Sequence, residues 1–543
     1  MALWDRLTDE ATLKQTTWAW DGTDFHQRTF GEGVTAARHV AAGLRKEGVK
    51  PGDIVATVLT NGEDAVAGIP GIWFAGARIA SLPIIARGMS VGNYVDQLKR
   101  LCALLEADCL LMEERYLDLL PLDDLGVRAI GFRKLVETPE QAEIDPPPLD
   151  ETILIQFSSG TTGEPKGAEL SGTAIERHTQ LLAERLRLDP ERDIGYMWIP
   201  LSHDMGLGCH LLAWYLGMSG VRSWPERFLQ DPKTWLDDCA RFSVTVTAGP
   251  PFALSMAARA EERDPSEAPL SLRLCLVGAE HVEWSTLSHA VEVFGPRGFK
   301  LETITAAYGL AEAVLAVTTG DVDSAPHYVD ITPDHVASGE VLETAHVPGH
   351  TRRVVSAGTP LPDLKVRVDE ATSEIVVSGP TLASGYYRNP EATQARFRDG
   401  EFWTGDLGFI RDGELYVLER ADDVLIVGGR NIYVEEVEEE LSQEDGIRAG
   451  VCAIVATRHT GRPRFVFVGE ADGSGADERE VAERLRKVAM EAAGVPLTEF
   501  VFLERGMFPK TPSGKVQRYR VRALVHDPEV GRRVELELLA HGV

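Results

Sequence analysis

The sequence lacks the features that anchor a protein in a membrane. No apolar run approaches the roughly 20 residues that a helix needs to cross a bilayer. The longest uncharged stretch, Met205 to Val221, contains glycines and a histidine. The N-terminus interrupts each apolar run with a charge, which is typical of neither a signal peptide nor a transit peptide. We therefore expect a soluble, cytoplasmic protein with no membrane span.

Paired cysteines and positive charge are also scarce. The six cysteines are scattered, with no C-x-x-C pair and no zinc-ligand spacing, so we expect reduced residues in a core. The 84 acidic residues outnumber the 55 basic ones and give a net charge of −29, which repels nucleic acid. We expect no nucleic-acid partner. Any polyphosphate site must create its own positive field.

No internal repeat or low-complexity block interrupts the chain, and 543 residues predict more than one domain. Short apolar runs alternate with helical patterns through the first four hundred residues, as in the strands expected at 53–59 and 272–277. A helix is expected from Gly172 to Leu186, capped by Ser171. This alternation predicts layered α/β structure. Around 374–416 short strands joined by Gly and Asp turns follow, with a hairpin at 411–417.

After Arg420 a new pattern begins. It predicts strands at 424–427, 451–457, 464–470 and 499–503 and helices at 434–441 and 478–493, which together make an α+β unit of about 120 residues, a usual domain size. We therefore expect domains at 1–420 and 421–543. In the first helix of this unit Val434, Val437 and Leu441 form an apolar stripe, and a solvated face is expected for Glu435, Glu436, Glu438, Glu439 and Glu440.

A glycine- and hydroxyl-rich loop follows the buried strand expected at 153–157. It reads Ser158-Ser-Gly-Thr-Thr-Gly-Glu-Pro-Lys-Gly167 and leads into another strand. Glycines let backbone N–H groups approach phosphate oxygens, hydroxyls add donors and Lys166 adds charge. It is not a Walker loop, which needs Gly-Lys-Ser/Thr opening a helix. A mobile polar loop would explain its glycines and serines but not the whole decapeptide.

The chain resembles the acyl-adenylate-forming superfamily, which includes acyl-CoA synthetases and fatty acyl-AMP ligases. The resemblance covers nearly the whole length in order, through the loop and the segments 198–207, 307–313, 403–408, 419–433 and 512–518. It implies a large N-terminal adenylate-forming domain with a small β-barrel-like subdomain, and a small mobile C-terminal α+β domain.

The resemblance also implies a role for each matched position. The phosphates of ATP would be bound by Ser158, Ser159, Gly160, Thr161, Thr162, Gly163 and Lys166. The adenine would lie against Gly278, Ala279, Glu280, Ala307, Tyr308 and Gly309, and the ribose against Asp406 and Arg420. Glu312, together with Thr162, would hold Mg²⁺, which suits a cation bound mostly through phosphates and water. Glu312 could instead be a charged residue on the helix that follows, and Asp406 an ordinary turn residue.

The resemblance also implies roles in the catalytic cycle for Lys515, Asp422 and His203. Lys515 would be the catalytic lysine, because a carboxylate attacking an α-phosphate brings two anions together and a lysine delivered by domain closure offsets that repulsion. Asp422 would be the hinge about which the small domain rotates. His203, expected with Lys515 and Glu312 among the catalytic residues, would border the acyl pocket as an aromatic gate, with a satisfied core histidine as the alternative. It makes no convincing metal pair with His210.

The expected reaction is ATP-dependent adenylation of a carboxylic acid, followed by transfer to a thiol of CoA or of a carrier-protein phosphopantetheine. The sequence 308–317 and the long segment 318–355 favour the fatty acyl-AMP ligase branch, for which an acyl carrier protein or a partner transferase is a candidate partner. Val434 replaces the proline usual in that branch. The alternatives are a full acyl-CoA ligase, a P-loop-type ATPase or kinase, and a non-adenylating protein that binds acyl-AMP.

The identity of the acid depends on side chains gathered from distant segments. We expect its pocket around His203, Trp224, Phe252 and 303–306. A medium or long fatty acid is the first expectation, and a polycyclic or aromatic acid the alternative.

Overall fold

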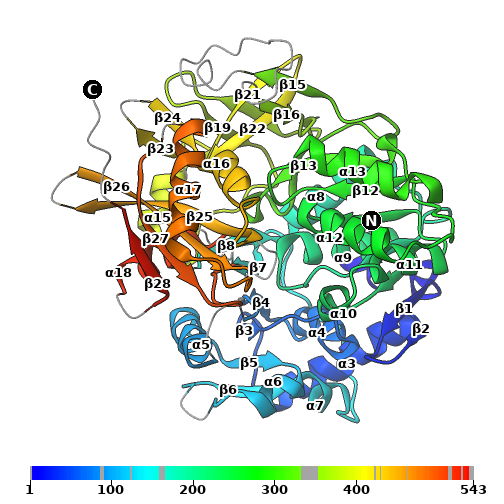
Figure 1. Ribbon diagram of the computed structural model, residues 1–543. Coiled ribbons are helices and arrows are strands. Elements are labelled where there is room, and N and C mark those ends of the chain that lie inside the picture. Colours follow the sequence, from blue (N-terminus) through cyan, green and yellow to red (C-terminus); the bar gives the residue numbers. More distant parts are fainter. Residues whose placement is uncertain are drawn as a thin grey trace.

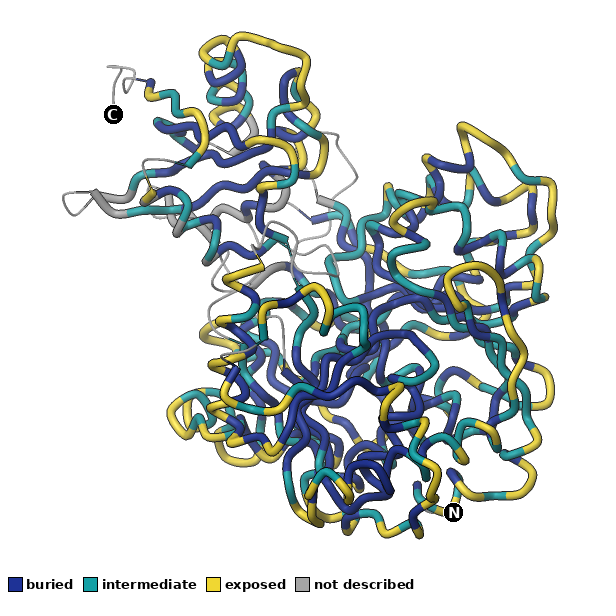
Figure 2. The backbone as a smooth tube through the Cα atoms, turned by 90° about the horizontal axis from the view of Figure 1, so that it is seen from below, coloured by how far each residue is buried: buried dark blue, intermediate teal, exposed yellow. Residues whose placement is uncertain are grey.

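The computed structural model describes residues 3–85, 91–122, 125–157, 165–331, 352–420, 424–427, 430–459, 462–493, 495–510, 516–527 and 530–536. Within these residues the chain forms a large α/β domain and a smaller C-terminal α+β domain, as the sequence predicts. The small domain is a separate lobe that carries the C-terminus (Figure 2). No helix among the described residues is both long and apolar enough to cross a membrane.

One sheet of the large domain leads into the predicted phosphate loop. Its strand order is β6 (Arg128–Gly131), β5 (Cys109–Met112), β3 (Ile54–Thr57), β4 (Arg78–Ser81), β7 (Thr152–Phe157) and β8 (Gly167–Ser171). The strands from β6 to β7 are parallel, and β8 runs antiparallel to β7. Because successive side chains of a strand point to opposite faces, Val55 enters the core under helices α3 (Phe30–Lys46) and α4 (Glu63–Phe74), whereas Ala56 enters the core under α5 (Val91–Leu105).

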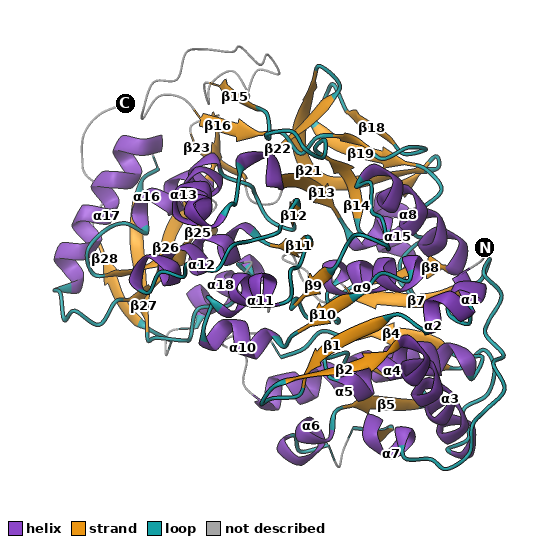
Figure 3. Cartoon of the chain, turned by 90° about the vertical axis from the view of Figure 1, so that its right-hand side faces the viewer, coloured by secondary structure: helices purple, strands orange, loops and turns teal. Residues whose placement is uncertain are grey.

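A second sheet forms the rest of the large domain's core (Figures 1 and 3). Its order is β17 (Thr359–Pro360), β14 (Ala316–Thr319), β13 (Ile304–Gly309), β12 (Leu274–Val277), β11 (Val246–Gly249), β9 (Gly195–Met197), β10 (Gly220–Arg222), β1 (Thr16–Trp20) and β2 (Phe25–Thr29). The run from β13 to β1 is parallel. The strands predicted at 53–59 and 272–277 are thereby confirmed as β3 and β12.

Helix α9 (Asp204–Leu216) lies between the cores of the two sheets. Met205 and Leu212 belong to the core of the second sheet, whereas Leu207 and Leu211 belong to that of the first. A helix that is apolar on every side is buried on every side, and this explains the uncharged run that the sequence shows here. Helix α8 (Gly172–Arg185) precedes it, and its cap is confirmed, because the backbone N–H of Ala174 donates to the Ser171 side chain.

The remaining helices of the large domain cover the sheets and connect their strands. They are α1 (Leu3–Arg6), α2 (Glu10–Leu13), α6 (Glu114–Leu119), α7 (Phe132–Val136), α10 (Pro225–Gln230), α11 (Thr234–Arg241), α12 (Pro251–Arg263), α13 (Trp284–Phe294) and α15 (Pro390–Arg396), with the 3-10 turns η1 (Gly295–Arg297), η2 (Leu301–Thr303) and η3 (Ala311–Ala313).

An antiparallel subdomain follows, built from β18 (Lys365–Val368), β19 (Glu374–Ser378), β20 (Phe397–Arg398), β21 (Glu401–Arg411) and β22 (Glu414–Arg420). The predicted hairpin is the β21–β22 turn, where Asp412 and Gly413 both have positive φ, 51° and 84°. Two such residues are the requirement of a type I′ turn. A further hairpin, β15 (Tyr328–Ile331) with β16 (Arg352–Val355), packs against β22 through Val329, Val354 and Tyr416.

The small domain is centred on a sheet of order β25 (Ile447–His459), β26 (Arg462–Ala471), β27 (Leu497–Leu503) and β28 (Arg532–Glu535). Helices α16 (Val434–Leu441) and α17 (Glu478–Ala493) cover one face and α18 (Arg518–His526) the other. Both predicted helices are confirmed with their bounds. The predicted strand 424–427 is β23 (Val424–Val427), paired with β24 (Arg430–Tyr433).

The prediction that the glutamates of helix α16 form a solvated face is wrong for Glu438. Glu438 is 7% exposed and accepts hydrogen bonds from both terminal nitrogens of Arg518, at 2.6 and 2.9 Å, and from the backbone N–H of Ile454, at 2.5 Å. Glu439 and Glu440 are exposed as expected. Glu438 lies four residues after Val434 and three before Leu441, so it borders the apolar stripe, and a buried carboxylate there needs the partner that Arg518 supplies.

Candidate active site

The predicted adenine residues follow two neighbouring parallel strands. Val277 of β12 lies opposite Ala306 of β13, so Gly278 and Tyr308 come at the carboxyl ends of adjacent strands. Ligands of α/β sheets bind at such ends. A Cβ on Gly278 would lie 2.6 Å from the carbonyl oxygen of Ala307, so the close approach of the two strands requires glycine. The next residue, Ala279, has φ of 68°, which is strained for alanine.

The predicted adenine and ribose residues meet directly. The Tyr308 hydroxyl donates a hydrogen bond to Oδ2 of Asp406 at 2.6 Å, although 98 residues separate them in the chain. Asp406 in β21 is paired in register with Arg420 in β22. The second sheet and the antiparallel subdomain therefore bring the two predicted ribose positions beside the adenine strand. The side chain of Arg420 lies outside the described part of the chain.

A tyrosine links the predicted phosphate lysine to the predicted magnesium ligand. The Tyr386 hydroxyl donates to Oε1 of Glu312 at 2.6 Å, and the ammonium of Lys166 lies 5.5 Å from the centroid of the same ring. Tyr386 is held there because it forms a bridge with Ala168 of β8. Close by, Val314 has φ of 74°, an outlier for a β-branched residue. Such strain concentrates at functional sites.

His203 caps helix α9. Its Nδ1 lies 2.6 Å from Oδ1 of Asp204 and 3.2 Å from the backbone nitrogen of Met205, which also donates to that carboxylate oxygen at 2.7 Å. Because the carboxylate is the closer acceptor for the Met205 N–H, we assign the Nδ1 proton to the bond with Asp204. This arrangement gives His203 a structural role at a helix N-terminus, and its catalytic role stays a prediction.

The other predicted residues lie outside the described part of the chain. They are Lys515, Asp422, Ser158, Ser159, Gly160, Thr161, Thr162 and Gly163. The residues that flank them are described: Phe157 pairs with Gly167 across β7 and β8, and Lys510 forms a bridge with Val516. The described residues on either side of the loop 158–164 therefore lie close together, and so do those on either side of 511–515.

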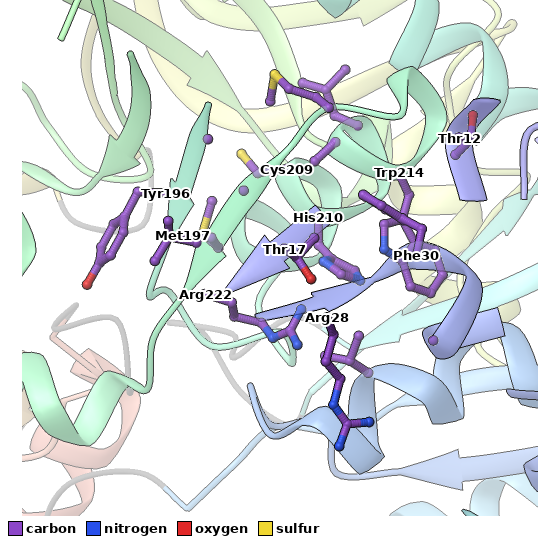
Figure 4. A pocket seen from close by; sticks show the side chains of 18 of the residues that line it. Thr12, Thr17, Arg28, Phe30, Tyr196, Met197, Cys209, His210, Trp214 and Arg222 are labelled. Carbon is purple, nitrogen blue, oxygen red and sulfur yellow. The ribbon is translucent and has the colours of Figure 1, made fainter. Parts of the chain in front are cut away.

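A large cavity runs beneath helix α9. It contains about 1430 Å³ of empty space, including the part open to solvent, and is lined mainly by apolar side chains. Cys209 and Leu212 line it from α9, and Met197 and Leu276 from the second sheet (Figure 4). Cys209 lies six residues beyond His203, or about 9 Å along the helix. None of the expected acid-pocket residues, His203, Trp224, Phe252 and 303–306, is among the described lining.

A model of the family described as AMP-binding enzyme matches residues 8–387. The chain belongs to this family.

Curated relatives of this AMP-binding enzyme include the medium-chain-fatty-acid–[acyl-carrier-protein] ligase JamA of Moorena producens, which is 30% identical over 69% of this chain and 67% of that protein. The long-chain-fatty-acid–AMP ligase FadD32 of Mycolicibacterium smegmatis is 29% identical over 71% and 70%. Among solved structures, one from a study of fatty acyl-adenylate ligases of E. coli and L. pneumophila has a TM-score of 0.87 at 24% identity, over 97% of this chain and 99% of that one. This last likeness concerns the fold.

One residue that contacts the candidate site was missed in the sequence. Tyr386 stands in the run Ser384-Gly-Tyr-Tyr387, where the Ser-Gly pair is typical of a turn but nothing indicates a contact with the predicted magnesium ligand. Its contact with Glu312 depends on a return of the chain to β8 after 200 residues, which local patterns do not encode. Among the described residues no three His, Cys, Asp or Glu side chains gather as metal ligands, so Glu312 is a single carboxylate.

Proposed function

We propose that this AMP-binding enzyme uses ATP to convert a carboxylic acid into an acyl-adenylate, with release of pyrophosphate, and then transfers the acyl group to a thiol. The observation that carries this proposal is the 2.6 Å hydrogen bond from Tyr308 to Asp406. It joins an aromatic ring that can stack on a base to a carboxylate that can accept hydrogen bonds from ribose hydroxyls. The ring and the carboxylate can therefore contact the base and the ribose of the same nucleoside.

The phosphate side of the site is assigned to Lys166 and the loop 158–163. Against a net charge of −29, Lys166 supplies local positive charge at the ring of Tyr386, whose hydroxyl bonds to Glu312. A single carboxylate such as Glu312, with the Thr162 hydroxyl, fits Mg²⁺ that is held mainly by phosphates and water. When bound, Mg²⁺ neutralises phosphate charge. Tyr386 fixes the Glu312 carboxylate through its hydroxyl, so that the carboxylate is oriented before nucleotide enters.

The chemical step is assigned to Lys515, in a small domain that we place at 421–543 with its hinge at Asp422. As the acid attacks the α-phosphorus, one P–O bond forms and the bond to pyrophosphate breaks, so negative charge moves onto the leaving group. An ammonium group offsets this charge and the repulsion between the two anions. Gly278, Ala279, Glu280 and the strand end at Ala307 to Gly309 hold the adenine meanwhile.

The acyl chain is assigned to the cavity under helix α9. Its mainly apolar lining suits the methylene groups of a medium or long chain. The fatty-acid ligases among the relatives support this assignment. As thiol acceptor we favour a carrier-protein phosphopantetheine, in line with JamA, over CoA, so an acyl carrier protein is the proposed partner.

Acid-dependent exchange of labelled pyrophosphate into ATP tests the first half-reaction. We expect exchange with a medium- or long-chain fatty acid and Mg²⁺, and none without acid. Release of phosphate instead of pyrophosphate would indicate an ATPase, and binding of acyl-AMP without exchange would indicate a non-adenylating protein. Mass measurement of products with CoA and with a phosphopantetheinylated carrier protein in separate reactions then identifies the acceptor, and efficient acyl-CoA formation would overturn the carrier-protein assignment.

A further inference from the structure

The cavity under helix α9 contains a cation that no carboxylate of the described residues neutralises directly. Arg222, at the end of β10, donates from Nε to the backbone carbonyl of Asn61 at 3.1 Å. Within the described chain its guanidinium makes no other hydrogen bond and no ion pair, and the residue lines the cavity. A guanidinium carries five N–H donors in a fixed fork. Four of these donors therefore remain for a group that enters the cavity.

The acidic residues of the cavity wall are already paired with other arginines. Glu63 binds Nε of Arg28 at 3.1 Å, and Asp64 lies 3.4 Å from Nε of Arg133. Burial lowers the pKa of Arg222 to about 10, an effect that the Glu63 charge opposes and the Arg28 charge reinforces. Arg222 thus stays cationic at neutral pH. Figure 4 shows the side chains of Arg222, His210 and Arg28 on one side of the cavity.

A second polar group that has no hydrogen-bond partner among the described residues lines the same cavity. His210, on helix α9, is 8% exposed, and its Nε2 makes no hydrogen bond within the described structure. Burial, and then the charge of Arg222, lower the pKa of His210 to about 3, so the ring is neutral and carries one N–H. Leaving a buried donor unsatisfied costs about 1 to 3 kcal/mol. Its position against Trp214, at a centroid distance of 4.7 Å, holds the ring at the cavity wall.

A plain fatty acid would leave both groups unsatisfied. Its terminal methyl group would also have to approach the guanidinium of Arg222. Removing water from this charged group would have a large free-energy cost. A carboxylate, in contrast, matches the planar fork of arginine with two parallel hydrogen bonds. The rest of the cavity wall is mainly apolar and suits the methylene chain between two polar ends.

We propose that the acid adenylated by this enzyme carries a second carboxylate at its far end, which Arg222 binds bidentately with His210 as an additional donor. This inference rests on the proposed function and names its substrate class as long α,ω-dicarboxylic acids. Four strand spacings separate β13, at the adenine, from β10, or about 19 Å across the sheet. The acid therefore has to be long enough to reach from one site to the other.

The test compares α,ω-dicarboxylic acids with monocarboxylic acids of the same chain length in acid-dependent pyrophosphate exchange. For the unaltered enzyme we expect kcat/KM to be about 10- to 100-fold higher for the dicarboxylic acid of the preferred length, the range for a hydrogen-bonded charge. In Arg222→Met this ratio should fall to about one, and in Arg222→Lys, which keeps the charge but not the fork, to an intermediate value. The control is Arg192→Met, a largely exposed arginine outside the cavity, which should keep the full ratio.

The outcomes separate this inference from the function on which it rests. If no acid of either class supports exchange, the proposed adenylation itself fails. If monocarboxylic acids support exchange as well as or better than their dicarboxylic partners in the unaltered enzyme, adenylation stands and the dicarboxylic assignment is overturned, whether or not Arg222→Met folds. A preference that persists in a folded Arg222→Met enzyme would overturn the role of Arg222.

Discussion

Glu438 and Arg518 form a buried ion pair in the small domain, with Nη1 to Oε1 at 2.6 Å and Nη2 to Oε2 at 2.9 Å. The pair joins helix α16 to the start of α18, and Ile454 of β25 bonds to both side chains. Arg518 is three residues after the proposed catalytic lysine. The start of helix α18 is therefore held by a carboxylate in a helix some 80 residues earlier in the chain.

Removing the carboxylate should destabilise the small domain. In Glu438→Gln the buried charge of Arg518 loses the carboxylate with which it is paired, and we expect the free energy of unfolding to fall by about 3 to 5 kcal/mol. Denaturant unfolding followed by a probe in the small domain measures this. Glu439→Gln, a substitution of the exposed neighbour, should change it by less than about 0.5 kcal/mol. Equal effects of the two substitutions would contradict a structural role for the pair.

Lys515→Ala tests the proposed chemistry. Without the ammonium group we expect acyl-AMP formation to slow by about 10²- to 10³-fold, the usual effect of losing one preorganised donor. Single-turnover formation of acyl-AMP is the measurement. Lys487→Ala, which removes an exposed lysine from helix α17 of the same domain, should leave the rate unaltered. An undiminished rate in Lys515→Ala would remove this residue from the adenylation step.

Tyr308→Phe keeps the aromatic face and deletes the hydroxyl that donates to Asp406. Because that bond orients the carboxylate for the ribose, we expect KM for ATP to rise about tenfold, with a smaller change in kcat. Steady-state exchange kinetics at varied ATP give both constants. Tyr328→Phe, at an exposed tyrosine of β15, is the matched control. A kcat effect without any KM effect would place Tyr308 in the chemical step instead of in binding.

Local patterns predict much of the fold and less of the site. The run Val434, Val437 and Leu441 gives helix α16 its bounds, and the Asp-Gly pair at 412 gives the β21–β22 turn. The burial of Glu438 depends on Arg518, 80 residues further along, and no pattern within one helix contains that information. The position of Glu438 nevertheless suggests that it has a partner, because a glutamate at the border of an apolar stripe has to be neutralised once the helix packs.

The candidate site, too, could be predicted from the sequence only in part. Motifs identify Tyr308 and Asp406 separately, but their hydrogen bond requires the register of two sheets. The proposed acid pocket could not be assigned from sequence, since residues from β9, β10, β12, α3 and α9 line the cavity. In particular, the uncharged run from Met205 to Val221 gives no indication that His210 and Arg222 line the same cavity, because that placement depends on the packing of helix α9 on the second sheet.

A buried histidine makes the stability of the large domain sensitive to acid. His178 on helix α8 donates from Nε2 to the carbonyl of Ala316 at 3.0 Å, and burial lowers its pKa from 6.5 to about 4, against the opposing effect of that hydrogen bond. Between these pH values the unfolded chain binds a proton that the folded protein does not, so stability is fully present above pH 6.5 and falls as the pH drops toward 4. The difference amounts to about 3 kcal/mol for this residue.

Urea unfolding between pH 7 and pH 4 measures this loss. In His178→Gln an amide replaces the titrating ring and can still donate to Ala316. The part of the pH dependence of the free energy of unfolding that is due to this residue should then disappear, even if the variant is less stable at pH 7. His289→Gln, at a partly exposed histidine paired with Glu262, should retain the slope of the unaltered protein. If His178→Gln and the unaltered protein lost stability in parallel over this range, the acid sensitivity would have to arise from other groups, and the burial of a neutral His178 would have no consequence for folding.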